Sequence, residues 1–328
     1  MSEVENSVDT VIRLLSKNMH VVKDDGAIAS IKVSSEWYDR ELFKNYDGEI
    51  TVGLAGSQDQ KIEMSGRTRR RLGSLRLNVW AADKPASSDS GKLMRNKMVE
   101  EVNRIVRQNR NKPNTTEYNF AGLGCVAGES HKAFQTGALT EPIPSRSSWA
   151  EFSSVDYEKI WYSDDNRYSK SHNVDGEYAL MLFRFKIDSR EKTVKQVVLV
   201  FEGYGTAPAG NGVTVKVWNH VAQAWQHAQT GTGGADETIT IAIISNLPDY
   251  VDDEDYVWLL ARTTNPSDGE TPAVLYCDYV NCIVTVNGIT YLDIVSFRDA
   301  DVVDVKPFIF RTEFTLKSWC FEDIGGVF

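Results

Sequence analysis

Residues 307–321 alternate between apolar and polar side chains, and this alternation predicts a long strand that is buried on one face. The apolar side chains that share one face are Phe308, Phe310, Phe314 and Leu316, and the polar ones that share the other are Arg311, Glu313, Thr315 and Lys317. Trp319 and Phe321 then place apolar side chains on the polar face. We therefore expect a partner to cover this end of the strand, with Phe308, Phe310, Trp319 and Phe321 as interface candidates.

The first 125 residues contain patterns of both helices and strands. Apolar residues at steps of three and four predict amphipathic helices over residues 4–19 and 91–110. Alternating residues predict strands in segments 31–37, 49–54, 61–64, 75–80 and 118–120. This order predicts a small sheet with two helices on one face, which lacks its last strand. Residues 307–321 would supply that strand, so we predict a discontinuous α+β domain made of residues 1–125 and 288–328.

Between these two segments the pattern changes to short strands alone. Alternating apolar residues predict strands over residues 179–187, 197–201, 213–217, 239–243, 256–260 and 274–286. Strands at this spacing, with no helical pattern longer than a turn, predict an inserted all-β sandwich of the jelly-roll type over residues 140–287. The formal net charge of the chain is −10, and residues 126–286 carry all of it. This step in charge also favours an independent inserted domain.

The composition argues against several classes of protein. No apolar run approaches the roughly 18 residues of a membrane helix, and the polar first residues do not resemble a signal peptide, so we expect neither membrane insertion nor secretion. The four cysteines form no CxxC pair and no histidine cluster joins them, so we expect free, mostly buried thiols. The five histidines are scattered and no nucleophile motif such as GxSxG or HExxH is present, so we expect no catalytic activity.

Three segments together carry a resemblance to a known family. Residues Asp9–Leu15 open a helix, Arg69–Leu77 lead into a strand, and Pro307–Phe314 close the domain. In this order they resemble the tail-terminator proteins at the neck of tailed bacteriophages and tailed archaeal viruses. The resemblance covers residues 1–125 and 288–322, and it rests on the order of elements. The inserted sandwich departs from a plain tail terminator.

The resemblance implies a structural protein of the virion, found in the neck or tail and assembled in the host cytoplasm. It implies a small α+β fold that forms a six-membered ring and caps the tail tube. The implied partners are other copies of the chain, the tail tube protein and the head-completion or connector protein, with genome DNA passing through the ring without sequence specificity. A head-tail connector or tail-tube component of similar fold is an alternative within the same class.

Arg67, Arg69, Arg70 and Arg71 form the one dense basic run of the sequence. In a ring, copies of this run would either line the lumen and contact phosphates of the passing genome, or pair with acidic groups on a neighbouring subunit. A hairpin tip that is simply solvated is the third interpretation.

The inserted segment is similar to the sandwiches of carbohydrate-binding modules, through residues 213–219 followed by Trp225. This similarity implies a second class of function, a glycan-binding protein that acts in attachment to the host surface. Trp161, Tyr162 and Trp225 are the candidate platforms for sugar rings. Tryptophan on alternating strand positions is more often part of a core, and an acidic domain that only keeps particles soluble is equally consistent with the sequence.

Two acidic clusters are weak calcium candidates, because calcium takes six to eight oxygen ligands. Their members are Asp164 and Asp165 in one cluster and Asp252, Asp253 and Asp255 in the other, and Asp278 and the backbone carbonyls near Asn219 are further candidate ligands. Neither has the spacing of an EF-hand, and solvated acidic loops are the favoured interpretation. We expect no other cofactor.

Overall fold

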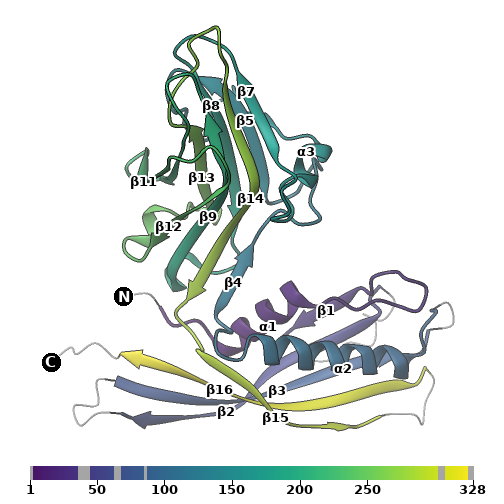
Figure 1. Ribbon diagram of the computed structural model, residues 1–328. Helices are drawn as coiled ribbons and strands as arrows, with labels where there is room; N and C mark the ends of the chain where they lie inside the picture. Colours follow the sequence, from purple (N-terminus) through teal and green to yellow (C-terminus); the bar gives the residue numbers. More distant parts are fainter. Residues whose placement is uncertain (1–2, 36–44, 63–67, 85–86, 302–306, 324–328) are drawn as a thin grey trace. The chain divides into compact units, whose positions relative to one another are not determined.

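The computed structural model describes residues 3–35, 45–62, 68–84, 87–301 and 307–323 (Figure 1). The chain divides into two compact units. Residues 3–115 and 287–328 contribute to one, which we call the α+β unit, and residues 116–286 to the other, which we call the sandwich unit. None of the described helices combines the length and the hydropathy that a transmembrane helix requires.

The α+β unit contains a five-stranded sheet in the order β1-β2-β3-β16-β15. Its strands are β1 (Ile31–Ser34), β2 (Gly48–Lys61), β3 (Thr68–Ala82), β15 (Tyr291–Asp299) and β16 (Ile309–Asp323). Strand β1 runs parallel to β2, and the other neighbours are antiparallel. β16 confirms the strand predicted over residues 307–321, and it pairs with β3 from Ile309 opposite Ala82 to Asp323 opposite Thr68. The last strand in the sequence is therefore an inner strand of the sheet.

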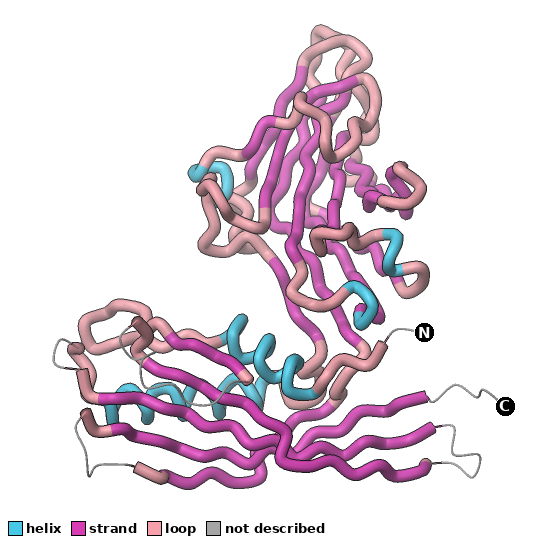
Figure 2. The backbone as a smooth tube through the Cα atoms, turned by 180° about the vertical axis from the view of Figure 1, so that it is seen from behind, coloured by secondary structure: helices cyan, strands magenta, loops and turns pink. Residues whose placement is uncertain are grey.

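Both predicted helices are present, as α1 (Ser7–Asn18) and α2 (Gly91–Gln108). Asn6 caps α1 and Ser90 caps α2, each by accepting a hydrogen bond from a backbone N–H of the first turn. Both helices lie on the same face of the sheet (Figures 1 and 2). Their apolar stripes pack on alternate residues of β2, β3 and β16, and this layer forms the core of the unit.

Strand β2 differs from the sequence prediction. Segments 49–54 and 61–64 were predicted as two strands, whereas one strand runs from Gly48 to Lys61, and residues 63 and 64 lie outside the described part of the chain. Residues 55–60 are small or polar and all are exposed, so they lack the alternation that marks a half-buried strand. The predicted end of the first strand at Trp37 lies outside the described residues.

The sandwich unit consists of two sheets and one short helix. Its elements are β4 (Thr115–Tyr118), β5 (Lys132–Ala138), β6 (Ala150–Glu151), α3 (Ser154–Glu158), β7 (Tyr168–His172), β8 (Tyr178–Lys186), β9 (Val194–Thr206), β10 (Val213–Asn219), β11 (Ala224–Gly231), β12 (Glu237–Ile243), β13 (Tyr256–Thr263) and β14 (Ala273–Val286). One sheet has the order β11-β10-β13-β8-β5-β6, and the other has the order β12-β9-β14-β4, with β7 also paired to β14. The predicted β-rich fold is confirmed, and its finer assignment to the jelly-roll type stays a prediction.

The segment around residue 118 belongs to the sandwich unit. The sequence placed the strand at residues 118–120 in the α+β domain, but Tyr118 and Phe120 are buried in the sandwich core, and β4 lies next to β14. This prediction was wrong because the pattern of a strand shows that one face is buried and does not show which sheet it joins.

Candidate functional site

Three strands of the α+β unit continue beyond the N-terminal end of α1 (Figure 1). We call this extension the arm, and it comprises residues 55–61 of β2, 68–74 of β3 and 319–323 of β16. All of residues 55–61 are exposed, and residues 68–73 of β3 are only half-buried. At roughly 3.4 Å per residue, the part of the arm in β2 is about 20 Å long.

Both edges of the arm lack a partner strand within the described part of the chain. Strand β1 pairs only with residues 48–51 of β2, and β15 pairs with β16 only as far as Trp319. Next to these edges, Leu54 and Phe321 are apolar and more than half exposed, at 54% and 52%. A strand edge without a neighbouring strand, beside exposed apolar side chains, forms a surface to which another strand can add.

The inner face of the arm encloses a cavity of about 540 Å³ against the segment that precedes α1. Its lining includes Glu5, Leu54, Asp59, Gly73 and Cys320. Glu5 is held by ion pairing with the buried Arg13, so this wall of the cavity is fixed. The cavity thus offers room for apolar and polar groups directly beside the open edge of β2.

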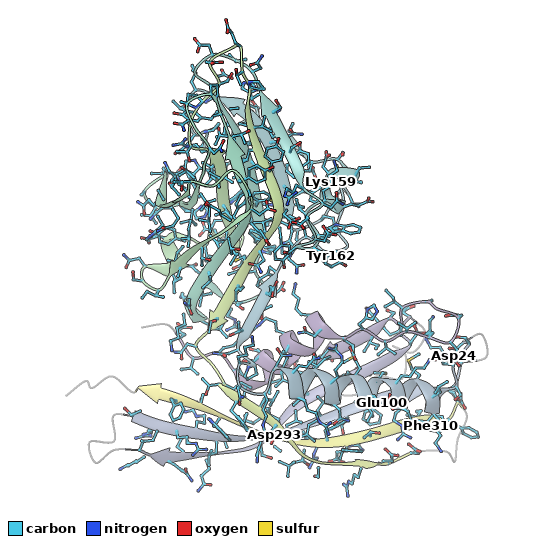
Figure 3. The ribbon with its side chains drawn as sticks, in the orientation of Figure 1. Asp24, Glu100, Lys159, Tyr162, Asp293 and Phe310 are labelled. Carbon is cyan, nitrogen blue, oxygen red and sulfur yellow. The ribbon has the colours of Figure 1, made fainter. Side chains whose placement is uncertain are left out.

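The predicted interface aromatics have different environments. The ring of Trp319 stacks on that of Tyr291, and the Arg70 guanidinium lies 4.6 Å from its centroid. Phe310 is buried beside the start of α2 (Figure 3), and Phe308 is half-buried. Phe321 alone of these candidates is more than half exposed. The chain itself therefore covers most of the apolar surface for which the sequence predicted a partner.

The basic run does not gather on one face. Arg69, Arg70 and Arg71 follow one another along β3, so Arg70 points to the face opposite the other two. Arg71 donates a hydrogen bond from Nε to Asp59 at 3.0 Å, and Arg70 covers Trp319. Arg67 lies outside the described residues.

The predicted sugar platforms are mostly occupied by contacts within the sandwich unit. The indole N–H of Trp161 donates to the carbonyl of Leu123 at 2.8 Å, and that of Trp225 donates to the carbonyl of Pro142 at 3.0 Å. Trp225 also packs against the ring of Trp218. Tyr162 is 59% exposed and is labelled at the surface in Figure 3. Two of the three candidates therefore act as packing residues here.

A different group of aromatic residues lies together on the outer face of the six-stranded sheet. Phe134 of β5 and Trp258 of β13 have ring centroids 6.5 Å apart and planes 27° from parallel. Tyr256 adjoins Trp258, and the guanidinium of Arg184 lies 4.4 Å from the centroid of Tyr256. We call these four residues the aromatic surface; all are partly exposed. The sequence shows Tyr256 and Trp258 on one face of a strand, but not that Phe134 joins them.

The second acidic cluster, Asp252, Asp253 and Asp255, lies in a turn that its side chains help to stabilise. The Asp252 carboxylate accepts hydrogen bonds from the backbone N–H groups of Glu254 and Tyr256 at 3.0 and 2.8 Å. Asp255 forms an ion pair with Lys186 at 3.2 Å, and Asp253 is exposed. These carboxylates are used within the chain, which agrees with the interpretation as a polar loop.

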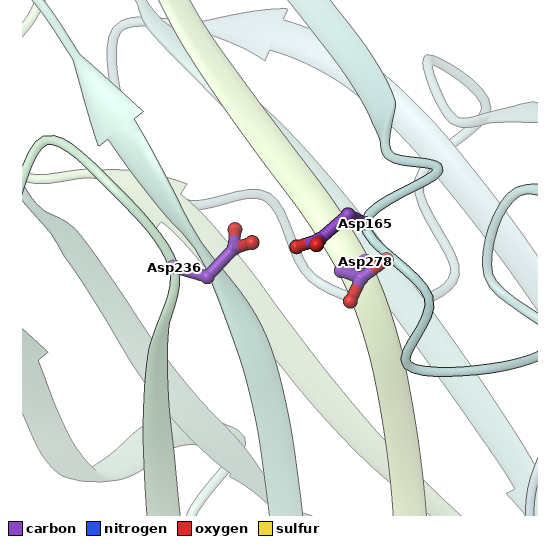
Figure 4. Close-up of side chains that lie close together, drawn as sticks. All are labelled: Asp165, Asp236 and Asp278. Atoms are coloured by element: carbon purple, nitrogen blue, oxygen red, sulfur yellow. The ribbon is translucent and has the colours of Figure 1, made fainter.

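A separate acidic group brings together Asp165, Asp236 and Asp278 (Figure 4). One carboxylate oxygen from each lies within 4.8 Å of the others. Asp278 sits at a bulge of β14, between Cys277 and Tyr279, and burial raises its pKa. The calcium candidates from the sequence included Asp165 and named Asp278 as a further contributor, but they did not include Asp236, because no local spacing connects residues so far apart in sequence. Asp164 instead accepts a hydrogen bond from the backbone N–H of Asn166.

Three of the five histidines have structural partners in the sandwich unit. His131 Nδ1 accepts a hydrogen bond from the backbone N–H of Lys186, His172 contacts Glu177, and His227 lies 2.8 Å from the hydroxyl of Tyr250. None of these pairs places a nucleophile beside a base in a described cavity. The absence of catalysis stays a prediction.

Comparison with known proteins gives limited matches. The family described as "Uncharacterized protein, C-terminal domain" matches residues 128–286 of the sandwich unit. No curated protein matches the sequence of the chain.

Solved structures of carbohydrate-binding modules are similar to part of the chain. The xylan-binding module CBM15 is 11% identical, with a TM-score of 0.28, and covers 52% of this chain and 97% of its own. A family 61 module in complex with β-1,4-galactotriose is 8% identical, with a TM-score of 0.22 and coverage of 55% and 92%. A family 11 module from Clostridium thermocellum, in complex with a β-1,3-1,4-mixed-linked tetrasaccharide, is 9% identical, with a TM-score of 0.21 and coverage of 52% and 88%. TM-scores this low indicate neither a function nor a binding site.

Proposed function

We propose that this chain is a structural subunit that assembles with copies of itself through the arm of the α+β unit. The observation that carries this proposal is the pair of strand edges without a described neighbour, on a three-stranded extension that neither α1 nor α2 covers. An isolated subunit would leave a row of backbone groups and the side chains of Leu54 and Phe321 in water.

The two edges of the arm differ, and this difference favours a ring. The edge of β2 is flanked by the cavity and Leu54, whereas the edge of β16 carries Phe321. If the β2 edge of one subunit pairs with the β16 edge of the next, the contact joins two different surfaces. The two subunits together then still present one unused β2 edge and one unused β16 edge. Contacts of this head-to-tail type close into a ring when the rotation between subunits allows it.

The finer proposal is a six-membered ring at the neck of a virion, of the tail-terminator type. It is supported by the resemblance of residues 9–15, 69–77 and 307–314 to that family. Ring closure would end polymerisation of the tail tube by presenting a face that accepts no further ring. Arg69 and Arg71, which share a face of β3, would then contact a neighbouring subunit or the phosphates of passing DNA.

Native mass spectrometry of the full chain tests the assembly. We expect a complex of six times the chain mass of 36.8 kDa, with Phe321→Glu shifting it to single chains, because a buried charge at the edge of β16 is costly. Val221→Glu is the matched control, since Val221 is exposed on the sandwich unit and should leave the complex intact. A wild-type chain that stays at 36.8 kDa at every concentration tested would overturn the proposal.

The aromatic surface favours a second candidate, glycan binding by the sandwich unit. Rings of Phe134 and Trp258 held side by side on a sheet face offer apolar faces to sugar rings, and the Arg184 guanidinium offers donors to hydroxyl groups. A glycan array that includes xylan, β-1,4-galactan and mixed-linked β-glucan tests this. Binding that Trp258→Ala abolishes and the exposed control Val221→Ala preserves would support it; no binding to any glycan would reject it.

A further inference from the structure

We propose that Asp165, Asp236 and Asp278 form a calcium-binding site in the sandwich unit. The three carboxyl groups converge from three separate segments, and Asp165 and Asp236 point toward each other with Asp278 beside Asp165 (Figure 4). Asp165 precedes β7, Asp236 precedes β12, and Asp278 lies within β14. The site is independent of the assembly through the arm.

The strongest indication of a bound cation is the state of Asp278. This residue is 1% exposed, and its Oδ1 atom has no hydrogen-bond partner among the described residues. The backbone N–H groups of Asp164 and Asp165 bond to the same carboxyl group. A buried carboxylate oxygen without a donor loses its hydration and gains nothing in return. A cation at the cluster would supply the missing interaction.

The charges at the cluster are incompletely balanced by the chain. Arg167 donates to Asp236 from Nε at 2.7 Å and lies 2.8 Å from Asp165 through Nη2. It supplies one positive charge against three carboxyl groups, so two negative charges remain when all three are ionised. A divalent cation balances them, whereas a proton on Asp278 would neutralise one. Two groups therefore compete with a divalent cation: a proton on Asp278, and the Arg167 guanidinium, whose Nη2 contacts both Asp165 and Asp236.

Ligand type and coordination geometry favour calcium over other divalent cations. The three ligands are carboxylate oxygens, which suit hard cations, and neither sulfur nor imidazole joins the group. Oxygens on opposite sides of Ca²⁺ are about 4.6–5.2 Å apart, whereas around Mg²⁺ they are about 4.0–4.2 Å apart. The aspartate oxygens lie within 4.8 Å of one another, a separation that either ion can span, so the preference for Ca²⁺ rests on its tolerance of irregular coordination. The Arg167 guanidinium, which contacts both Asp165 and Asp236, would have to move aside. Asp165 is exposed, so water can complete the coordination.

The geometry also indicates what the ion would do. It would connect the loop before β7 and the turn before β12 to the bulge of β14. Asp165 has a positive φ of 66°, a conformation that is uncommon for residues other than glycine and that the ion would help to hold. Because the three segments meet only in the folded chain, binding would stabilise the fold in proportion to calcium concentration.

Isothermal titration and thermal denaturation of the full chain, after removal of metal with a chelator, test the proposal. We expect one Ca²⁺ per chain and a rise of several degrees in Tm with calcium, and a much smaller response to the same concentration of Mg²⁺. Asp236→Asn and Asp278→Asn should each lose at least tenfold in calcium affinity. Glu270→Gln is the matched control, because Glu270 is an exposed acidic residue of the sandwich unit outside both clusters and should leave binding unchanged.

A second measurement separates the ion from the competing proton. With a protonated Asp278, Asp278→Asn would preserve the packing, and its Tm would equal or exceed that of the wild type with and without calcium. That result, or a wild-type chain that gives no heat and no change in Tm with calcium, would overturn the proposal. Loss of calcium binding in Asp278→Asn, in a variant whose circular dichroism matches the wild type, supports it.

Discussion

The indole ring of Trp319 lies flat against the phenol ring of Tyr291, with centroids 3.6 Å apart and planes 7° from parallel. The two residues are directly opposite in the pairing of β15 with β16. Arg70 of β3 covers Trp319 as well, so one stack crosses three strands at the base of the arm. The outer face of the sheet is therefore held together at the point where β15 ends its pairing.

Removing this stack should destabilise the α+β unit. Trp319→Ala deletes a half-buried ring and its contact with Tyr291, and we expect a loss of roughly 2–3 kcal/mol in the free energy of unfolding. Urea denaturation at fixed protein concentration measures it. The control Phe321→Ala removes an exposed ring two residues away and should change stability by less than about 0.5 kcal/mol in single chains. Equal effects of the two changes would contradict the role of the stack.

Arg95 connects α2 to the two last strands. Its side chain is 2% exposed, and its Nη1 lies 2.6 Å from the Asp299 carboxylate and 2.9 Å from the Thr312 hydroxyl. Arg95→Ala should cost about 2–3 kcal/mol of stability, because it removes a buried side chain with its hydrogen bond to Thr312 and leaves a cavity, although Asp299 itself is 59% exposed. Arg104→Ala, on the same helix, removes an exposed pair with Glu101 and should cost less than about 0.5 kcal/mol. Thermal denaturation of both variants in parallel decides whether burial makes this difference.

His220 should make the stability of the sandwich unit sensitive to acid. Burial lowers the pKa of His220, while Asp252 and Asp253 act in the opposite direction. The unfolded chain therefore binds a proton near the ordinary value of about 6.5 more readily than the folded chain does. Stability should be unaffected above that pH and should fall as the pH drops below it.

The test is the difference in unfolding free energy between pH 7.5 and 5.5. This difference should be smaller in His220→Gln than in the wild type, since glutamine does not titrate. Other groups contribute equally to both proteins, so the comparison isolates His220. An identical decrease in both proteins would show that His220 does not sense the pH.

The thiols should differ sharply in reactivity. Cys125 is exposed, whereas Cys277, Cys282 and Cys320 are buried, and burial raises the pKa of Cys277 and Cys282. Thiolates are the reactive species, so a thiol reagent should modify one cysteine quickly in the native chain and four after denaturation. Cys125→Ser should abolish the fast reaction. Fast modification of a second native thiol would indicate that the sandwich core opens.

The sequence predicts those elements in which one face is buried. In residues 307–321 and in both helices, the spacing of apolar residues within the element itself shows which of its faces is buried. The arm could not be predicted in this way, because residues 55–60 are exposed on both faces and show no period. Likewise, the alternation around Tyr118 predicts a strand, but it does not indicate which of the two sheets that strand joins.

The candidate sites were harder to predict than the fold. Asp165, Asp236 and Asp278 meet through the pairing of distant strands, and no spacing in the sequence marks them. Trp161 and Trp225 appeared suited to stacking on sugars by residue type alone, whereas their indole N–H groups bond to backbone carbonyls of their own unit. Residue type suggests a chemistry, but only the tertiary contacts show whether a side chain remains available for it.

The position of β16 has a consequence for synthesis on the ribosome. Strand β3 is translated before the sandwich unit, while the neighbour that pairs with it over its whole length is translated only after the sandwich unit. The sheet of the α+β unit therefore remains incomplete while the residues of the sandwich unit leave the exit tunnel and fold. During that interval the exposed flank of β3 is open to a nascent chain on the next ribosome, so polysomes are where mispairing of this protein would begin.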